Sequence, residues 1–338
     1  MNKLKHSVTL YGFGNRYVRG LCTFDEIMQK ARGMGGDGIE LVSPQMVPGH
    51  PNPSDSWIEY FKESCAVNDL DPVCFSIYID NGKHRGRYLH EAERMTDTIA
   101  GMEYGKRMGF KIIRSQDPLL PSTMEKLLPY AEELDVHLAI ELHGPYTPST
   151  PIFAEYAELF ERKGSDHLGV VMDFSAFASG APSNCLAIFP DGICNKSLLY
   201  EINKLYATTE IPEEKLIQMI YDKGGDDVDV YVAKRRIFSI DAKTARMGTP
   251  FWRTHPDYDG FRSLLKHSRY MHGKFYHVDE DLLCPDIDYA GFVRIMKEEG
   301  YSGYIASEYE GDRYDNTVDD EEQIRRHIRM LDKLWEEK

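Results

Sequence analysis

Short apolar segments alternate with helical segments along most of this chain, and this alternation constrains the fold more than any other feature. Eight segments have the alternating or continuous apolar pattern of buried strands, and they span residues 7–12, 38–42, 73–79, 111–115, 136–145, 168–174, 274–279 and 303–309. A helix or a helical insertion is expected after each. This order predicts a parallel (β/α)8 TIM barrel. A doubly wound sheet is the competing fold, but no G-x-G-x-x-G turn follows the first strand.

The regular pattern stops between the sixth and seventh strands. Residues from about 175 to about 270 are irregular, with helical pieces, and are far longer than a usual strand-to-helix connection. We interpret them as a large, mostly helical insertion over the C-terminal face of the barrel, within a single domain of residues 1–338. Its aromatic residues Phe177, Tyr231 and Trp252 would stack on an aromatic ligand or simply pack a lid. Whether this segment is a lid or a subunit interface is left open.

Composition limits the classes of partner. The formal net charge of −15 disfavours binding to nucleic acid, since an acidic surface repels phosphates. No apolar run is long enough to span a bilayer, and the first residues lack the pattern of a secretory signal. The six cysteines include no C-x-x-C pair, which predicts reduced thiols and a cytoplasmic protein. Cys185 and Cys194 are the one pair in which a disulfide is worth checking.

The fifth strand, VHLAIELHGP, ends in a carboxylate and an imidazole. Glu141 and His143 are two residues apart, so they point to the same side of the strand. At the C-terminal end of a barrel strand they would lie where active sites form. The alternative is structural, with Glu141 paired to a neighbouring arginine and His143 capping the turn at Gly144.

Polar residues also stand near the ends of the other late strands. Asp173 ends the sixth strand, His277 lies in the seventh and Glu308 in the eighth. Each could instead have a purely structural role: Asp173 as a helix cap, His277 as a core histidine and Glu308 as an ion-pair partner of Arg313. Together with Glu141, however, they would bring three carboxylates and one imidazole to one face. That donor set predicts a divalent-metal site, with Mn²⁺ favoured and Mg²⁺ or Co²⁺ as alternatives.

Several motifs resemble those of the xylose isomerase-like barrels, the superfamily of sugar phosphate isomerases and epimerases. They are GGDGIEL, GFKIIR, AIELHG, GVVMDF, FYHVD and GYIASEYEG. The resemblance covers nearly the whole chain outside the insertion. It implies that Glu141, Asp173, His277 and Glu308 hold the metal.

Within the superfamily, the chain is most similar to the catalytic alpha subunits of bacterial C-glycoside deglycosidases. The similarity lies in length, in the four ligands, in HGPY after the fifth strand and in the large insertion. It implies a lyase that cleaves the carbon–carbon bond between a 3-oxo-sugar and an aromatic aglycone such as a flavonoid. It also implies a small beta subunit as partner in a hetero-oligomer.

His143 is the candidate base for removing the proton next to the keto group, because imidazole titrates near neutral pH. Glu141 and Glu308 are further candidate acids or bases. Arg114 and Trp252 are candidate substrate contacts, although Arg114 would equally pair with a carboxylate.

Three other functions remain open at this point. A ketose 3-epimerase or other sugar isomerase would use Glu141 and Glu308 for proton exchange, but the arginine that such enzymes usually carry after the seventh-strand histidine is missing from HVDEDLLCPD. An inosose dehydratase would share the metal ligands. A non-catalytic barrel that binds a ligand is the third alternative.

Overall fold

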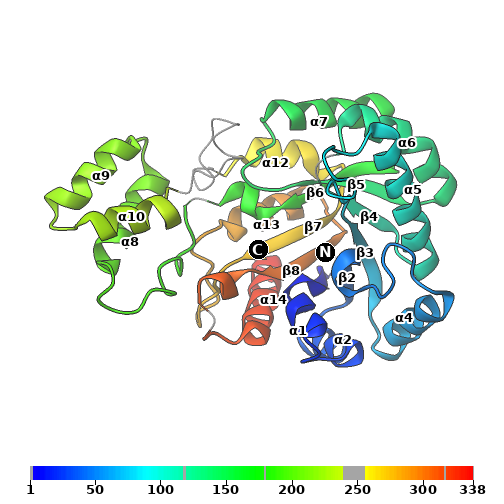
Figure 1. The fold of residues 1–338 in the computed structure, drawn as a ribbon, viewed down its shortest axis with the longest axis horizontal. Helices are drawn as coiled ribbons and strands as arrows, with labels where there is room; N and C mark the ends of the chain where they lie inside the picture. The colour runs from blue at the N-terminus through cyan, green and yellow to red at the C-terminus, as the bar shows by residue number, and fades with distance from the viewer. Residues whose placement is uncertain (1–2, 117–118, 179, 239–255, 316, 338) are drawn as a thin grey trace.

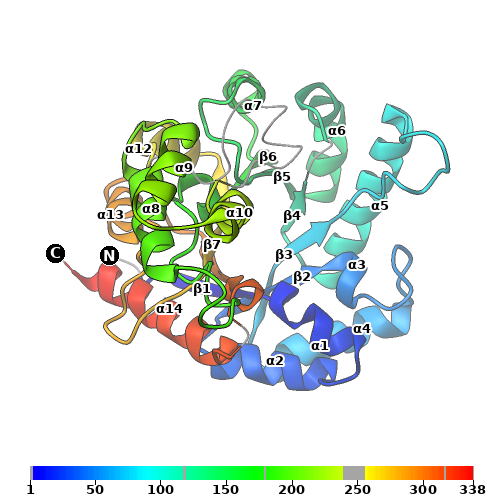
Figure 2. The ribbon, with the colours of Figure 1, turned by 60° about the vertical axis from the view of Figure 1, so that its left-hand side comes forward.

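A computed structural model describes residues 3–116, 119–178, 180–238, 256–315 and 317–337. Its strands form one closed barrel in the order β1 to β8, and each neighbouring pair is parallel (Figures 1 and 2). The strands are β1 Lys5–Thr9, β2 Gly38–Val42, β3 Asp71–Ile77, β4 Ile112–Ser115, β5 His137–Leu142, β6 Leu168–Asp173, β7 Ser268–Phe275 and β8 Tyr304–Tyr309. The predicted TIM barrel is therefore confirmed.

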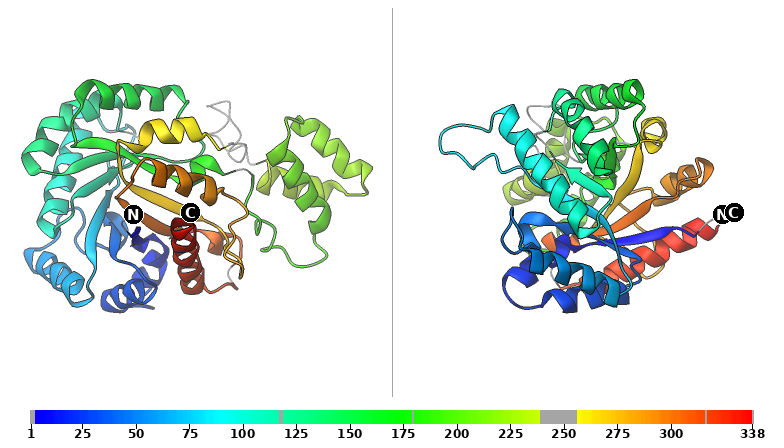
Figure 3. Two further views of the ribbon diagram at one scale, coloured as in Figure 1. Left: turned by 180° about the vertical axis from the view of Figure 1, so that it is seen from behind. Right: turned by 90° about the vertical axis from the view of Figure 1, so that its right-hand side faces the viewer.

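Helices surround this barrel and connect its strands. They are α1 Gly14–Val18, α2 Phe24–Gly33, α3 Ser43–Met46, α4 Asp55–Val67, α5 Glu91–Met108, α6 Pro121–Leu134, α7 Pro151–Lys163, α8 Lys196–Thr208, α9 Glu213–Asp222, α10 Asp227–Arg236, α12 Tyr258–Leu265, α13 Tyr289–Glu298 and α14 Asp320–Glu336. The chain ends lie close together in both views of Figure 3. None of the helices in the described ranges is long and apolar enough to cross a membrane.

Local sequence signals account for several helix boundaries. Thr23 and Glu26 form a capping box at the start of α2, in which each side chain bonds the backbone N–H of the other residue. The closing helix α14 buries Ile324, Ile328 and Leu331 against the barrel, as their spacing predicts.

The seventh strand begins earlier than the sequence indicates. Residues 274–279 were expected to form it, but β7 spans Ser268–Phe275. The prediction missed the first part of β7 because Gly273 lies inside it, and glycine is poorly suited to a strand interior. A close approach explains this glycine: a Cβ atom at this position would lie 2.7 Å from the carbonyl oxygen of Ala306 and 2.9 Å from the ring of His327.

Helices α8, α9 and α10 lie between β6 and β7 and project from the barrel as a separate group (Figures 1 and 3). We call residues 196–236 the helical arm. It has its own apolar cluster, which includes Leu199, Ile202 and Leu216 from this region. Tyr276 belongs to the same cluster and Tyr314 packs against it. These tyrosines follow β7 and β8, so the arm is attached at the C-terminal end of the barrel.

Candidate active site

The barrel interior has an apolar layer with a polar layer above it. A small cluster containing Cys74, Ile112, Ala139, Val171, Tyr270 and Ala306 fills the lower level. Two residues further along the same strands stand Ser76, Arg114, Glu141, Asp173, His272 and Glu308, all of them buried. Since residues two apart share a face, one strand geometry places both layers. The polar layer faces the C-terminal end, where TIM barrels carry their active sites.

Four of these side chains, Glu141, Asp173, His272 and Glu308, form a compact donor cluster. One ligand atom from each of Glu141, Asp173 and His272 lies within 4.8 Å of the other two. His272 Nδ1 is 2.8 Å from Glu141 Oε1, 4.0 Å from Asp173 Oδ2 and 3.1 Å from Glu308 Oε2. The structure thus brings Glu141, Asp173 and Glu308 together, as the sequence analysis expected.

The imidazole of this cluster belongs to His272, and the sequence analysis assigned it to His277. Because β7 ends at Phe275, His277 lies two residues beyond the strand and is only half-buried. His272 is the residue that β7 points into the barrel beside Asp173, its direct partner in the β6–β7 register. The misassignment follows from the strand boundary. A strand predicted to begin at Lys274 includes His277, whereas the observed strand includes His272.

The donor atoms of this cluster suit a divalent cation. Asp173 Oδ2, His272 Nδ1 and Glu308 Oε2 are buried and make no hydrogen bond of good geometry. Buried polar atoms without such partners are rare in folded proteins and call for an explanation. An ion bound between them would satisfy all three atoms, and carboxylate oxygens with one imidazole are ligands that Mn²⁺, Co²⁺ or Zn²⁺ accept.

Arg114 binds carboxylates in this layer. It is 2% exposed, and its guanidinium lies 2.5 Å from Glu141 Oε2 and 3.2 Å from Glu40 Oε1. Burial alone would raise the pKa of Glu141, but Arg114 and His272 together outweigh burial and hold that pKa well below its usual range. Glu141 is therefore a carboxylate at neutral pH.

Lys274 is a site residue that the sequence analysis did not single out. Its ammonium is 2% exposed and lies 3.1 Å from Asp173 Oδ2, 3.2 Å from Glu310 Oε1 and 3.5 Å from Glu308 Oε2. Burial would lower the pKa of Lys274, yet these carboxylates raise it well above its ordinary value. Lys274 stands next to Phe275, Tyr276 and Val278 in the sequence, and this was the available signal, because a lysine buried among such residues requires acidic partners.

His143 lies at the mouth of the same site. Its Nδ1 lies 2.6 Å from the carbonyl oxygen of Gly144, so Nδ1 carries the proton that this contact needs. Its Nε2 is 3.3 Å from Lys274 Nζ and 3.7 Å from Asp173 Oδ2. Both the predicted turn contact and the position beside the cluster are therefore present.

A cavity of about 410 Å³ opens above these residues, and Tyr78, Glu141, His143, Lys274 and Glu308 are among those that line it. Pockets that bind small molecules have volumes in this range. A sugar-sized ligand in this cavity would lie against Glu141, Glu308 and His143 together.

Comparison with known proteins agrees with this geometry. The model of the xylose isomerase-like TIM barrel family matches residues 28–334. The chain belongs to this family. The resemblance in the sequence motifs is thereby confirmed.

Two curated relatives match nearly the whole of this chain. The 3'-dehydrocarminate deglycosidase alpha subunit of Microbacterium sp. is 26% identical over 98% of this chain and 95% of the relative. The C-glycoside deglycosidase alpha subunit of Arthrobacter globiformis is 28% identical, over 94% and 87% respectively. Among solved structures, a D-psicose 3-epimerase crystallised in the presence of D-fructose has a TM-score of 0.57 at 11% identity, covering 98% of this chain and 99% of that one.

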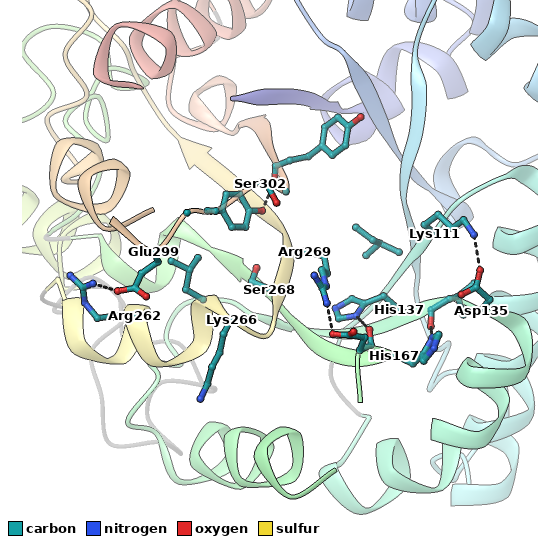
Figure 4. A pocket seen from close by; sticks show the side chains of 18 residues that line it. Lys111, Asp135, His137, His167, Arg262, Lys266, Ser268, Arg269, Glu299 and Ser302 are labelled. Atoms are coloured by element: carbon teal, nitrogen blue, oxygen red, sulfur yellow. Dashed lines mark hydrogen bonds and ion pairs between the residues drawn. The ribbon is translucent and has the colours of Figure 1, made fainter. Parts of the chain in front are cut away.

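A larger cavity, of about 770 Å³, lies at the opposite end of the barrel of this family member (Figure 4). Its walls come from the N-terminal ends of the later strands. The cations there already have acidic partners: Lys111 pairs with Asp135, Arg269 with Asp166 and Arg262 with Glu299. In TIM barrels this end contributes to stability, whereas the active site lies at the C-terminal end. We therefore assign the active site to the smaller cavity.

The structure places two of the three aromatic residues that were considered as possible ligand contacts. Trp252 lies outside the described residues. Phe177 is fully buried and packs on Phe261 and Phe292, so it belongs to the core. Tyr231 lies on the helical arm and is 60% exposed.

Proposed function

We propose that this chain is the catalytic subunit of a divalent-metal-dependent carbon–carbon lyase that cleaves 3-oxo-C-glycosides. Two relatives that match almost all of the chain are named as deglycosidase alpha subunits. These names imply a partner subunit, and we propose that it is a small beta subunit in a hetero-oligomer. The buried donor cluster of Glu141, Asp173, His272 and Glu308 supports metal dependence.

The observation that carries the proposal is the orientation of His143. With the Nδ1 proton directed at the Gly144 carbonyl, the basic lone pair of the neutral ring is on Nε2. This atom accepts a hydrogen bond from Lys274 Nζ and lies 3.7 Å from Asp173 Oδ2, and both His143 and Lys274 line the cavity. A general base must come within hydrogen-bond reach of the proton it removes, and this position provides that reach for a sugar over the cluster.

In the proposed reaction His143 Nε2 takes the proton from C2 of the sugar, next to the keto group at C3. The electrons of the C2–H bond form the second bond between C2 and C1. The electrons of the bond between C1 and the aromatic carbon leave with the aglycone, which takes up one proton. The products are an unsaturated keto sugar and the free aglycone.

The other residues of the site orient and stabilise. Glu141, Asp173, His272 and Glu308 would hold the divalent ion, for which Mn²⁺ is our first choice. When bound, the ion would polarise the keto oxygen and stabilise negative charge as it develops. Lys274 keeps the surrounding carboxylates compensated and contacts His143.

Glu141 and Glu308 are weaker candidates for the base. Burial would raise the pKa of Glu308, but the neighbouring Lys274 and His272 lower it instead. Glu141 is held charged by Arg114 in the same way. A carboxylate with a lowered pKa accepts a proton poorly, which favours His143.

The test is release of the aglycone from a 3-oxo-C-glucosyl flavonoid in the presence of Mn²⁺, with and without the proposed beta subunit. We expect His143→Ala to lower the rate by about 10²–10⁴-fold, the usual contribution of a positioned base. His267→Ala is the matched control, because His267 pairs with Glu161 far from the cavity. Equal rates in wild type and His143→Ala would refute the assignment of the base.

A sugar epimerase is the second candidate, favoured by the two carboxylates, Glu141 and Glu308, that reach His272 Nδ1 at 2.8 and 3.1 Å. Ketohexoses tested in parallel separate the two functions. Their interconversion without aglycone release would assign the chain to the epimerases, with these two residues as the proton-transfer pair.

We also propose a cytoplasmic location. All six cysteines, including Cys185 and Cys194, are free thiols. Reduced thiols are usual in the cytoplasm, whereas secreted proteins commonly pair theirs.

A further inference from the structure

One partner of Arg114 is a fully buried carboxylate that lies beneath the donor cluster. Glu40, in the middle of β2, is 0% exposed. We propose that Glu40 is the positioning residue of the metal site, which aims His272 and Glu141 at the ion from below. This inference rests on the divalent metal of the proposed function.

The first contact of Glu40 fixes a ligand ring. Glu40 Oε2 lies 2.7 Å from His272 Nε2, and the other ring nitrogen, Nδ1, faces Glu141 and Glu308. A carboxylate at one nitrogen selects the tautomer whose other nitrogen is free to bind metal, and it fixes the ring plane. Glu40 therefore determines which nitrogen of His272 is presented to the ion.

The second contact acts through Arg114. Glu40 Oε1 lies 3.2 Å from Arg114 Nε, while the far end of the same guanidinium is 2.5 Å from Glu141 Oε2. Arg114 Nε also donates to Ser76 Oγ at 2.7 Å. A planar guanidinium held at one edge by Glu40 presents its other edge in a fixed direction. One carboxylate on β2 thus orients ligands that β5 and β7 supply.

The remaining contacts show that this site requires a charged carboxylate. Ser76 Oγ donates to Glu40 Oε1 and Tyr270 Oη donates to Oε2 at 3.0 Å. Arg114, Ser76 and Tyr270 thus direct donors at the two oxygens, and His272 Nε2 lies within ion-pair distance. Glutamine has nearly the same shape, but its NH₂ group would face donors on one side, and a buried donor without an acceptor is costly.

The experiment measures Mn²⁺ binding by calorimetry and the visible spectrum of bound Co²⁺, using the full-length chain without substrate. We expect Glu40→Gln to weaken Mn²⁺ binding by about 10–100-fold, as is typical when the partner of a metal-bound histidine is lost, and to shift the Co²⁺ spectrum. Tyr270→Phe is the matched control. It removes one neutral donor to Glu40 from the same buried place without changing the charge, so its affinity should stay close to that of the wild type.

Glu40→Asp provides a second variant in case the glutamine variant does not fold. Aspartate keeps the charge but is one methylene shorter, so it should bind Mn²⁺ more tightly than the glutamine variant and less tightly than the wild type. If either variant folds and binds Mn²⁺ as tightly as the wild type, with an unchanged Co²⁺ spectrum, the positioning role is wrong while the metal site stands. If the wild type itself binds no divalent metal, both the inference and the proposed metal dependence fail.

Discussion

Replacing Arg114 with methionine tests whether the polar layer is held together by its charges. Methionine has a similar length without the charge. The substitution leaves Glu141 and Glu40 in the barrel interior without the guanidinium that contacts both, and it removes the donors to Ser76 Oγ and Tyr78 Oη. Arg114 is 2% exposed, so the ion pairs that the substitution breaks are buried.

Loss of one partner from a buried ion pair costs about 3–5 kcal/mol. The entropy of unfolding is about 2.1 cal/mol/K per residue, or about 0.7 kcal/mol/K for the 338 residues of this chain. The unfolding temperature of Arg114→Met should therefore fall by about 4–7 °C at neutral pH when a chelator removes divalent metal.

The loss should depend on pH in one direction. Arg114 keeps the pKa of Glu141 below its value in the unfolded chain, so this pairing stabilises the protein above the unfolded pKa and is lost as pH falls through the folded pKa. The difference between wild type and Arg114→Met should be greatest at neutral pH and should shrink below about pH 4. Added Mn²⁺ should recover part of it, because the cation compensates Glu141.

Thermal unfolding followed by circular dichroism at fixed scan rate measures these effects. Arg162→Met is the control. Arg162 forms a bidentate ion pair with Glu125, with hydrogen bonds of 2.8 and 2.9 Å, but its side chain is exposed. Exposed ion pairs contribute little to the free energy of unfolding, so the unfolding temperature of Arg162→Met should barely change. Equal shifts in the two variants, or a shift in Arg114→Met that is as large at about pH 3 as at pH 7, would refute the reasoning.

Two further predictions concern residues outside the polar layer. Gly273→Ala should lower the free energy of unfolding by about 1–3 kcal/mol in urea titration, because its Cβ would crowd the Ala306 carbonyl and the His327 ring; an unchanged midpoint would contradict the packing at the β7–β8 seam. Asp286 is buried, which raises its pKa to about 7, while its contacts with Ser183 lower it only in part. A raised carboxyl pKa means that the native state holds the proton, so this residue's contribution to stability falls as pH rises from about 4 to about 7. Asp286→Asn should therefore gain in unfolding temperature relative to wild type over that range and keep a constant advantage above it, and a difference that does not vary with pH would contradict the burial argument.

The sequence was sufficient to predict the barrel because each parallel strand is buried on both faces. Segments such as residues 38–42 and 168–173 are nearly continuous apolar runs, and glycine pairs or loops separate them from amphipathic helices. The helical arm was predictable only as an interruption. Its helices pack mainly on one another, so nothing in their pattern indicates that they project from the barrel.

Three of the four members of the donor cluster could be found from single strands. Glu141, Asp173 and Glu308 each stand at or near the last residue of an otherwise apolar run, where a carboxylate is conspicuous. Glu40 was hidden for the opposite reason. It lies inside a five-residue buried strand, and only its contacts show that four donors surround it.

His272 could not be identified from its own strand, because the information lies in the pairing between strands. In the closed sheet Asp173 is opposite His272, and Lys274 is opposite Glu308. Once Asp173 and Glu308 are taken as members of one layer, this register requires the inward residues of β7 to be His272 and Lys274. His277 lies beyond the paired segment, so no shift within the strand brings it to that layer. A strand with a glycine in its interior is therefore better located by the register of its two neighbours than by its own apolar pattern.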